Sequence, residues 1–157
     1  MSKVLGICFS EKSGEEMIKV DTINLIASKG IINDRYFKEN NDKDIQITLI
    51  ESENIDYVNE ILLSNISYVD FRRNIITKGI KLNELVNKEF TIGNVKIRGH
   101  RLCDPCKYLQ DKLQQKNLVK KLANKGGLRC EILSDGIISA KDNIIIDWLY
   151  LYPFKMV

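Results

Sequence analysis

The sequence has few of the residues and motifs on which common enzyme sites depend. Its 157 residues include one histidine, one tryptophan and two prolines. It has no G-x-S-x-G segment, P-loop or G-x-G-x-x-G segment, so the usual signatures of serine hydrolysis and nucleotide binding are absent. A net charge of +3 is too weak to indicate nucleic-acid binding by itself.

Long apolar runs are also missing. A transmembrane helix needs about 18 consecutive apolar residues. The longest apolar stretch here, from Ile144 to Phe154, is broken by Asp147 and Pro153. Charged residues from Glu11 onward interrupt the apolar start too early for a signal peptide. We therefore expect a soluble, cytoplasmic protein with a single domain over residues 1–157.

Short strand patterns dominate what is present. We expect extended segments over residues 3–10, 18–28, 45–50, 89–92, 95–101, 128–133, 137–139 and 144–152. Gly93-Asn94 predicts a hairpin, and a turn at Asp135-Gly136 predicts a second one. Two helices are expected, one with Ser52 as N-cap that closes at Asn65, and one over 107–124. Without a βαβα alternation, this pattern predicts an α+β fold, mainly β, built as a mixed and mostly antiparallel barrel.

The segment Cys103-Asp104-Pro105-Cys106 has the spacing of a metal or redox site. A zinc site would need four ligands, so His100 and the pair would still require a distant Cys8 or Cys130. A thioredoxin-like dithiol is locally similar, but the motif here follows about 100 residues of largely β character. The only other proline, Pro153, gives such a dithiol little chance of a neighbouring cis-proline.

Two further interpretations of the cysteine pair remain open. In the first interpretation both cysteines are buried packing residues, because cysteine is often found in protein cores. In the other, Cys106 alone is a reactive or metal-ligating thiolate, stabilised by a helix N-terminus and by Arg101 and Lys107. A soft thiolate suits a transition metal or persulfide chemistry.

Phe71-Arg72-Arg73-Asn74 is the second candidate cluster. Adjacent residues of an extended chain point to opposite faces, so we expect at most one of Arg72 and Arg73 to face inward. An inward arginine would need an anion such as a phosphate or carboxylate. The alternative is a surface arginine pair beside a turn at Asn74.

Other segments are ambiguous by themselves. Asp34-Arg35-Tyr36 predicts a loop ion pair, and Gly126-Gly127 predicts a helix end that also permits close backbone approach to a ligand. Lysines at 112, 116 and 120 are typical of a solvated helix face, and His100 of a structural histidine.

In order along the chain, these segments resemble the MOSC domain, named for its place at the C-terminus of molybdenum cofactor sulfurases. The matching pieces are residues 7–10, Gly30 with 34–36, 46–51, 71–80, Ile92-Gly93, 103–106 and 126–129 continuing to Asp142. Since they cover nearly the whole chain, we expect a stand-alone member of this family. Two positions depart from the family pattern, where Asn33 and Lys141 replace expected glycines.

The resemblance implies a β-rich barrel, a pyranopterin molybdenum cofactor and either redox or sulfur-transfer chemistry. It implies that Cys106 is the molybdenum ligand and the catalytic residue, and that Arg72 and Asn74 line the cofactor pocket. Arg129, Asp34 and Arg35 are further expected cofactor-binding residues.

The implied activity is reduction of N-hydroxylated bases or similar small molecules. The alternative is a carrier of sulfur, as persulfide, or of cofactor, without redox catalysis. The expected partners are the pterin cofactor, a small-molecule substrate, and a separate electron donor or cysteine desulfurase. No nucleic-acid or membrane partner is expected.

Overall fold

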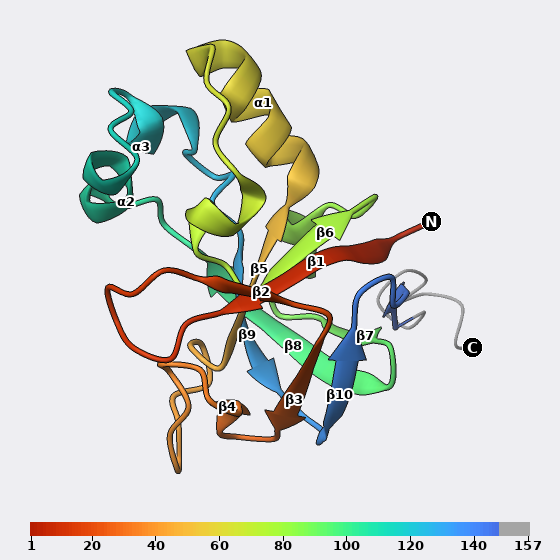
Figure 1. The fold of residues 1–157 in the computed structure, drawn as a ribbon. Coiled ribbons are helices and arrows are strands. Elements are labelled where there is room, and N and C mark those ends of the chain that lie inside the picture. Colours follow the sequence, from red (N-terminus) through yellow and green to blue (C-terminus); the bar gives the residue numbers. More distant parts are fainter. Residues whose placement is uncertain (148–157) are drawn as a thin grey trace.

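The computed structural model describes residues 1–147, in which short strands predominate (Figure 1). The strands are β1 (Lys3–Phe9), β2 (Ile18–Val20), β3 (Thr22–Ile26), β4 (Gly30–Ile31), β5 (Ile47–Glu51), β6 (Ile75–Lys78), β7 (Glu89–Ile92), β8 (Val95–Leu102), β9 (Leu128–Ile132), β10 (Gly136–Ser139) and β11 (Ile144–Ile146). The helices are α1 (Ser52–Leu62), α2 (Lys107–Lys112) and α3 (Leu118–Lys121), with 3₁₀ turns η1 (Tyr68–Phe71) and η2 (Leu82–Leu85).

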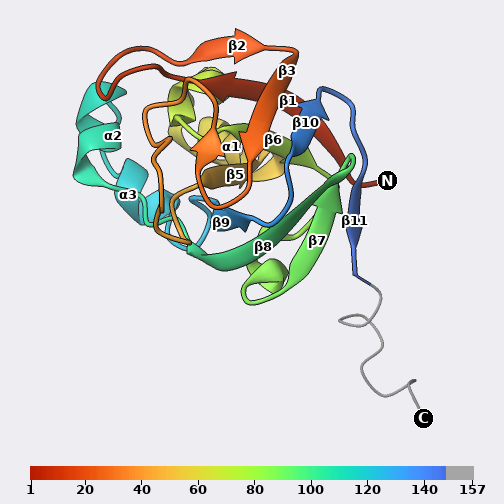
Figure 2. The ribbon, with the colours of Figure 1, turned by 90° about the horizontal axis from the view of Figure 1, so that it is seen from below.

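The strands form one large curled sheet and one small sheet (Figures 1 and 2). The large sheet has the order β11-β7-β8-β9-β5-β6-β1-β2, and the small one has the order β10-β3-β4. Only the β5–β6 pair of the described sheets is parallel, because α1 and η1 form a crossover between them. This half-barrel confirms the predicted mixed and mostly antiparallel fold.

The predicted hairpins had different outcomes. Gly93-Asn94 does join β7 to β8, as expected. The second predicted hairpin is wrong, because β10 pairs with β3 while β9 lies between β8 and β5. Both edges of β9 are therefore already occupied. Strand β11 ends at Ile146, and residues 148–152 of the longer predicted strand lie outside the described residues.

The continuous helix predicted over 107–124 is wrong, since α2 and α3 are separated by a turn. Gln114 and Asn117 have φ of 53° and 67° there, a left-handed backbone that no α-helix contains. Despite the break, Leu109, Leu118 and Leu122 are all buried in one apolar cluster. None of the helices within residues 1–147 is long and apolar enough to cross a membrane.

The boundaries of α1 also differ from the expectation. Ser52 is its first residue rather than its cap, and Glu51 at the N-cap makes no side-chain capping bond. The helix ends at Leu62 because Leu63 takes a left-handed conformation, with φ of 50°. Ile55 and Val58 are buried as predicted, whereas Ile61 is 38% exposed.

Apolar side chains pack on both faces of the large sheet. Strand β1 illustrates this, because Ile7 belongs to the cluster inside the half-barrel and Cys8 to the cluster beneath the helices. Strand residues alternate between the two faces, so one strand can serve both clusters. Full burial of an aliphatic side chain stabilises the fold by roughly 1.5–3 kcal/mol.

The pair Gly126-Gly127 sets the entry into β9. A Cβ at Gly126 would lie 2.5 Å from the carbonyl oxygen of Cys103, and one at Gly127 would collide with the carbonyl oxygen of Leu49. Gly127 also has φ of 109°. The two glycines thus let this segment pass between the cysteine loop and β5, and they permit close approach to protein backbone rather than to a ligand.

We predict that Gly127→Ala destabilises the protein by about 3 kcal/mol or more, since it adds both a left-handed strain and a backbone collision. Urea unfolding followed by circular dichroism measures this loss. Gly6→Ala is the control, because its Cβ would meet only Ile76 side-chain atoms at 3.7 Å or more. Equal stability of the two variants would contradict the role assigned to Gly127.

Candidate functional site

An open hollow of about 480 Å³ lies where several loops converge beside α2. It is lined by Ser13, Gly14, Arg35, Tyr36, Arg72, Arg73, Asp104, Cys106, Tyr108, Leu109 and Arg129. These residues come from the β1–β2 loop, the loop after β4, the η1–β6 connection, the β8–α2 loop, α2 itself and β9. Figure 2 shows α2 beside the β1–β2 loop, and residues of both elements line the hollow.

The two cysteines of the C-x-x-C segment have different environments. Cys106 is exposed in the hollow immediately before α2, whereas Cys103 is buried. Burial raises the pKa of Cys103, against the opposing effect of nearby arginines. All four cysteines are free thiols, and no group of three metal-binding side chains is found within residues 1–147.

The remaining two cysteines are buried in the protein interior. Burial raises the pKa of Cys8 to about 12, and its thiol donates a hydrogen bond to the carbonyl oxygen of Arg73 at 2.9 Å. Complete burial raises the pKa of Cys130 well above its ordinary value. Cys106 is therefore the one cysteine of the chain that solvent reaches.

Four arginines line the same hollow as the exposed thiol, namely Arg35, Arg72, Arg73 and Arg129. Arg72 and Arg73 both line the hollow, so the prediction that at most one of them faces inward is wrong. The reason is local backbone geometry: Arg72 ends η1 with φ of 63° and does not belong to an extended strand. Alternation between faces applies to extended chain only.

Backbone carbonyls hold two of these guanidinium groups. Arg72 donates to the carbonyl oxygen of Glu15 at 2.7 Å, and Arg73 donates to that of Gly126 at 2.9 Å. Carbonyl oxygens fix a guanidinium without neutralising it. Both positive charges thus remain available to an anion in the hollow.

The other two arginines differ in their partners. Arg35 pairs with the buried carboxylate of Asp34 at 3.4 Å, and its guanidinium stacks on the Tyr36 ring 4.5 Å from the centroid. The Nε atom of Arg129 is buried and has no hydrogen-bond partner among the described residues. A buried donor without a partner costs about 1–3 kcal/mol, which a bound acceptor would recover.

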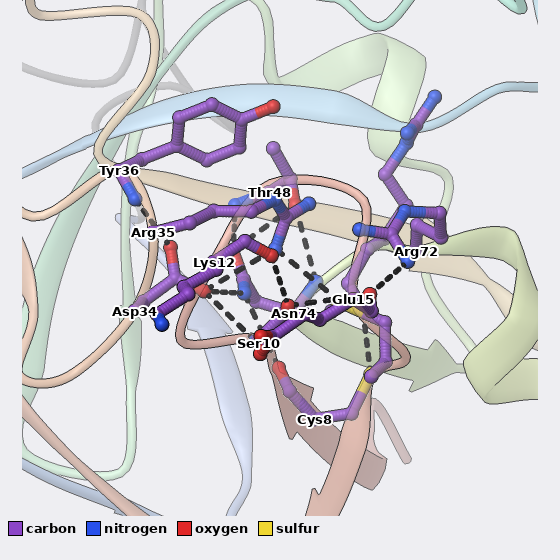
Figure 3. Close-up of polar contacts among 12 residues, drawn as sticks. Cys8, Ser10, Lys12, Glu15, Asp34, Arg35, Tyr36, Thr48, Arg72 and Asn74 are labelled. Atoms are coloured by element: carbon purple, nitrogen blue, oxygen red, sulfur yellow. Dashed lines mark hydrogen bonds and ion pairs between the residues drawn. The ribbon is translucent and has the colours of Figure 1, made fainter. Parts of the chain in front are cut away.

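Asn74 and Asp34 lie behind the hollow instead of lining it (Figure 3). The amide oxygen of Asn74 accepts bonds from the backbone N–H and hydroxyl of Thr48, each at 3.1 Å. Its NH₂ group donates to the Cys8 carbonyl oxygen at 3.2 Å and to Asp34 at 3.5 Å. Both ends of the Asn74 amide are thus already bonded within the protein.

Asp34 fixes the loops that flank the hollow. Its carboxylate accepts bonds from the backbone N–H groups of Ser10 and Tyr36, besides its contact with Arg35. Ser10 in turn donates its hydroxyl to the Lys12 carbonyl oxygen at 2.7 Å. Figure 3 shows these bonds extending from Asn74 to the β1–β2 loop.

The two residues that depart from the family pattern have the left-handed backbone that glycine favours. Asn33 and Lys141, which replace expected glycines, have φ of 72° and 75°. Asparagine tolerates a left-handed backbone better than most residues. Asp34 therefore keeps its buried position even though no glycine precedes it.

Other predicted contributors lie outside the lining of the hollow. Arg101 pairs with Asp44 at 2.6 Å and lowers the pKa of that carboxyl group. His100 contacts Glu131 at 2.8 Å. Lys107 is exposed at the start of α2 and does not line the hollow.

Sequence reasoning missed the lining residues Ser13, Gly14, Tyr108 and Leu109, and it gave no cofactor-binding role to Arg73 or Asp104, although both lie in its candidate segments. Asp104 and Tyr108 flank Cys106 in the sequence, and this proximity was an available signal. Ser13 and Gly14 reach the hollow only through the tertiary fold.

The arrangement combines an excess of fixed positive charge with one accessible thiol. Among the described lining residues, Asp104 contributes the one carboxylate against four guanidinium groups. Such a site favours an anionic ligand that also contains a group able to bond to sulfur.

Comparisons with known proteins identify the family and the fold. The family model of the MOSC domain matches residues 35–145, and no curated protein matches the chain significantly. The YuaD protein of Bacillus subtilis is 16% identical, with a TM-score of 0.78 over 93% of this chain and 96% of that one. YiiM of Geobacillus stearothermophilus is 16% identical, with a TM-score of 0.75 over 94% and 75%.

YiiM of Escherichia coli is similar too, with 18% identity and a TM-score of 0.70 over 94% of this chain and 70% of that one. At such identities these structures establish the fold alone. The family match covers more than half of the chain and includes Cys106 and all four arginines of the hollow. The chain therefore belongs to the MOSC domain family, which is associated with molybdenum-cofactor-related functions.

Proposed function

We propose that the hollow binds a pyranopterin molybdenum cofactor, with Cys106 as the protein ligand of the metal. The proposed activity is reduction of N-hydroxylated bases or similar small molecules. The observation that carries this proposal is that four arginines and the single exposed thiol line the same hollow.

The donor set fits the chemistry of that cofactor. A pyranopterin carries a phosphate, and Arg72 and Arg73 offer positive charges that no carboxylate of the described residues neutralises. Arg129 offers a buried Nε–H that lacks an acceptor. The molybdenum of this cofactor is bound by sulfur, and the Cys106 thiolate would be a further sulfur donor within the hollow.

Each residue then has a distinct part in the proposed reaction. Arg72, Arg73 and Arg129 hold the anionic end of the cofactor, and Cys106 holds its metal. Asn74 and Asp34 keep the surrounding loops in place from behind. When bound, the cofactor supplies the two-electron chemistry that reduces the N–O bond of the substrate, and the protein orients it.

The alternative is a sulfur or cofactor carrier that performs no redox catalysis. It is supported by the same observation that Cys106 alone among four cysteines is exposed. A carrier would form a persulfide on Cys106 when incubated with a cysteine desulfurase and cysteine. An intact-mass increase of one sulfur atom on a protein that lacks reductase turnover would favour the carrier.

We predict that protein made in a host that synthesises the cofactor contains molybdenum and releases a fluorescent oxidised pterin. Cys106→Ser should remove most of the molybdenum, because a hydroxyl is a harder and weaker ligand than a thiolate. Elemental analysis and pterin fluorescence measure both quantities. Wild-type protein without either signal would refute cofactor binding.

We also predict that Arg129→Gln weakens retention of the pterin by about 10- to 100-fold, the equivalent of one charged hydrogen bond. Retention is measured as bound pterin after serial dilution and filtration. Arg98→Gln is the matched control, since Arg98 lies on β8, contacts Glu89 at 3.9 Å and does not line the hollow. Equal losses in both variants would contradict the role of Arg129.

A third prediction concerns thiol reactivity. Iodoacetamide should modify one cysteine of the native, cofactor-free protein near neutral pH, because the high pKa values and burial of Cys8, Cys103 and Cys130 keep these thiols neutral and inaccessible. Intact mass should show one adduct in the wild type and none in Cys106→Ser. Two or more adducts in the folded protein would contradict the assigned burial.

A further inference from the structure

Positive charge is concentrated in one part of the chain. Residues 107–125, here called the lysine segment, contain six lysines and one carboxylate, at Asp111. The remainder of the chain has 18 cationic and 20 anionic side chains, so it is slightly negative. The net charge of +3 therefore originates entirely in the lysine segment.

The charges of this segment face solvent. Lys107, Lys112, Lys116 and Lys120 are exposed, and none of the six lysines forms an ion pair with any residue in 1–147. Three leucines of the segment, at 109, 118 and 122, are buried in the cluster beneath the helices, and the fourth, Leu113, packs against it partly buried. Packing on one side and unneutralised charge on the other give the segment a fixed, cationic outer surface.

The lysine segment borders the candidate site directly. It begins one residue after Cys106, and its Tyr108 and Leu109 line the hollow. Figure 1 shows α2 and α3 together at one side of the sheet, projecting from the body of the protein. A macromolecule bound to this surface would stand beside the open side of the hollow.

We propose that the lysine segment is the docking surface for an acidic electron-carrier protein of the flavin or iron–sulfur class. This inference rests on the proposed reductase function and adds its electron source. Reduction follows R–NH–OH + 2 e⁻ + 2 H⁺ → R–NH₂ + H₂O, in which the N–O bond breaks and water leaves. The carrier is oxidised and supplies the electrons, and solvent supplies the protons.

Charge complementarity favours a protein carrier over the other candidates. The segment contains no arginine and one aromatic residue, Tyr108, whereas nucleic-acid surfaces combine arginine with aromatic stacking. A second copy also has exposed carboxylates, among them Glu11, Glu15 and Glu16 of the β1–β2 loop. Self-association is therefore one of the outcomes that the test separates.

The test compares two double charge reversals with the wild type. Lys116→Glu/Lys120→Glu alters the lysine segment, and Lys38→Glu/Lys78→Glu alters exposed lysines elsewhere by the same charge. The probe is an acidic two-iron ferredoxin. Its binding is measured by calorimetry at low ionic strength, and its support of turnover is measured with an N-hydroxylated adenine. Methyl viologen, a small dye that needs no docking surface, is the second electron donor.

We expect the lysine-segment variant to lose about tenfold or more in kcat/KM for ferredoxin and in binding, as when electrostatic steering is removed. Turnover with methyl viologen should remain unchanged in every variant, and the control variant should match the wild type with both donors. The wild-type rate with ferredoxin should fall steeply with added salt.

Several results would overturn the proposal. They are no ferredoxin binding by the wild type, equal binding by all three proteins, or binding of a random DNA or RNA oligonucleotide that depends on Lys116 and Lys120. Self-association that the reversal abolishes, seen by sedimentation, would also overturn it. Absence of dye-driven turnover in cofactor-loaded wild type would instead refute the reductase function, while calorimetry would still decide the docking surface.

Discussion

The buried side-chain amide of Asn74 joins three segments that are far apart in the sequence. It bonds to Thr48 in β5, to Cys8 in β1 and to Asp34 in the loop after β4. Its backbone continues the same connection, because its N–H and C=O bond to Thr48 and Cys8. Removing the amide would leave buried donors and acceptors without partners, the costliest way to lose a hydrogen bond. The loops that carry Arg35 and Arg72 depend on this junction.

Arg72 and Arg73 keep their positive charge in the hollow because their hydrogen-bond partners are uncharged. Carboxylate partners would fix Arg72 and Arg73 equally well but would neutralise them. Carbonyl oxygens of Glu15 and Gly126 fix them and leave their charge intact. The Gly126-Gly127 pair serves the same end, because close backbone passage brings a carbonyl acceptor within reach of Arg73. The hollow thus keeps an excess of positive charge within a protein whose net charge is only +3.

The sequence predicted the parts of this structure that depend on local pattern. Alternating strands, the Gly93-Asn94 hairpin and the buried residues Ile55 and Val58 were found from periodicity. The pairing of β10 with β3 was not found from the sequence, because these two strands lie more than 100 residues apart along the chain. Both arginines entered the hollow because of the left-handed Arg72, a conformation that residue identity does not signal. The family resemblance named Cys106, Arg72 and Asn74, but the separation of lining from supporting residues required the fold.

The bond from Arg72 to Glu15 has an evolutionary consequence. The acceptor is a backbone carbonyl, and every amino acid supplies one. The side chain at position 15 is exposed, so natural variants of the β1–β2 loop can differ there without disturbing Arg72. The family model itself begins after this loop, at residue 35. A loop of different sequence can thus still complete this cationic site, provided that the path of the chain is kept.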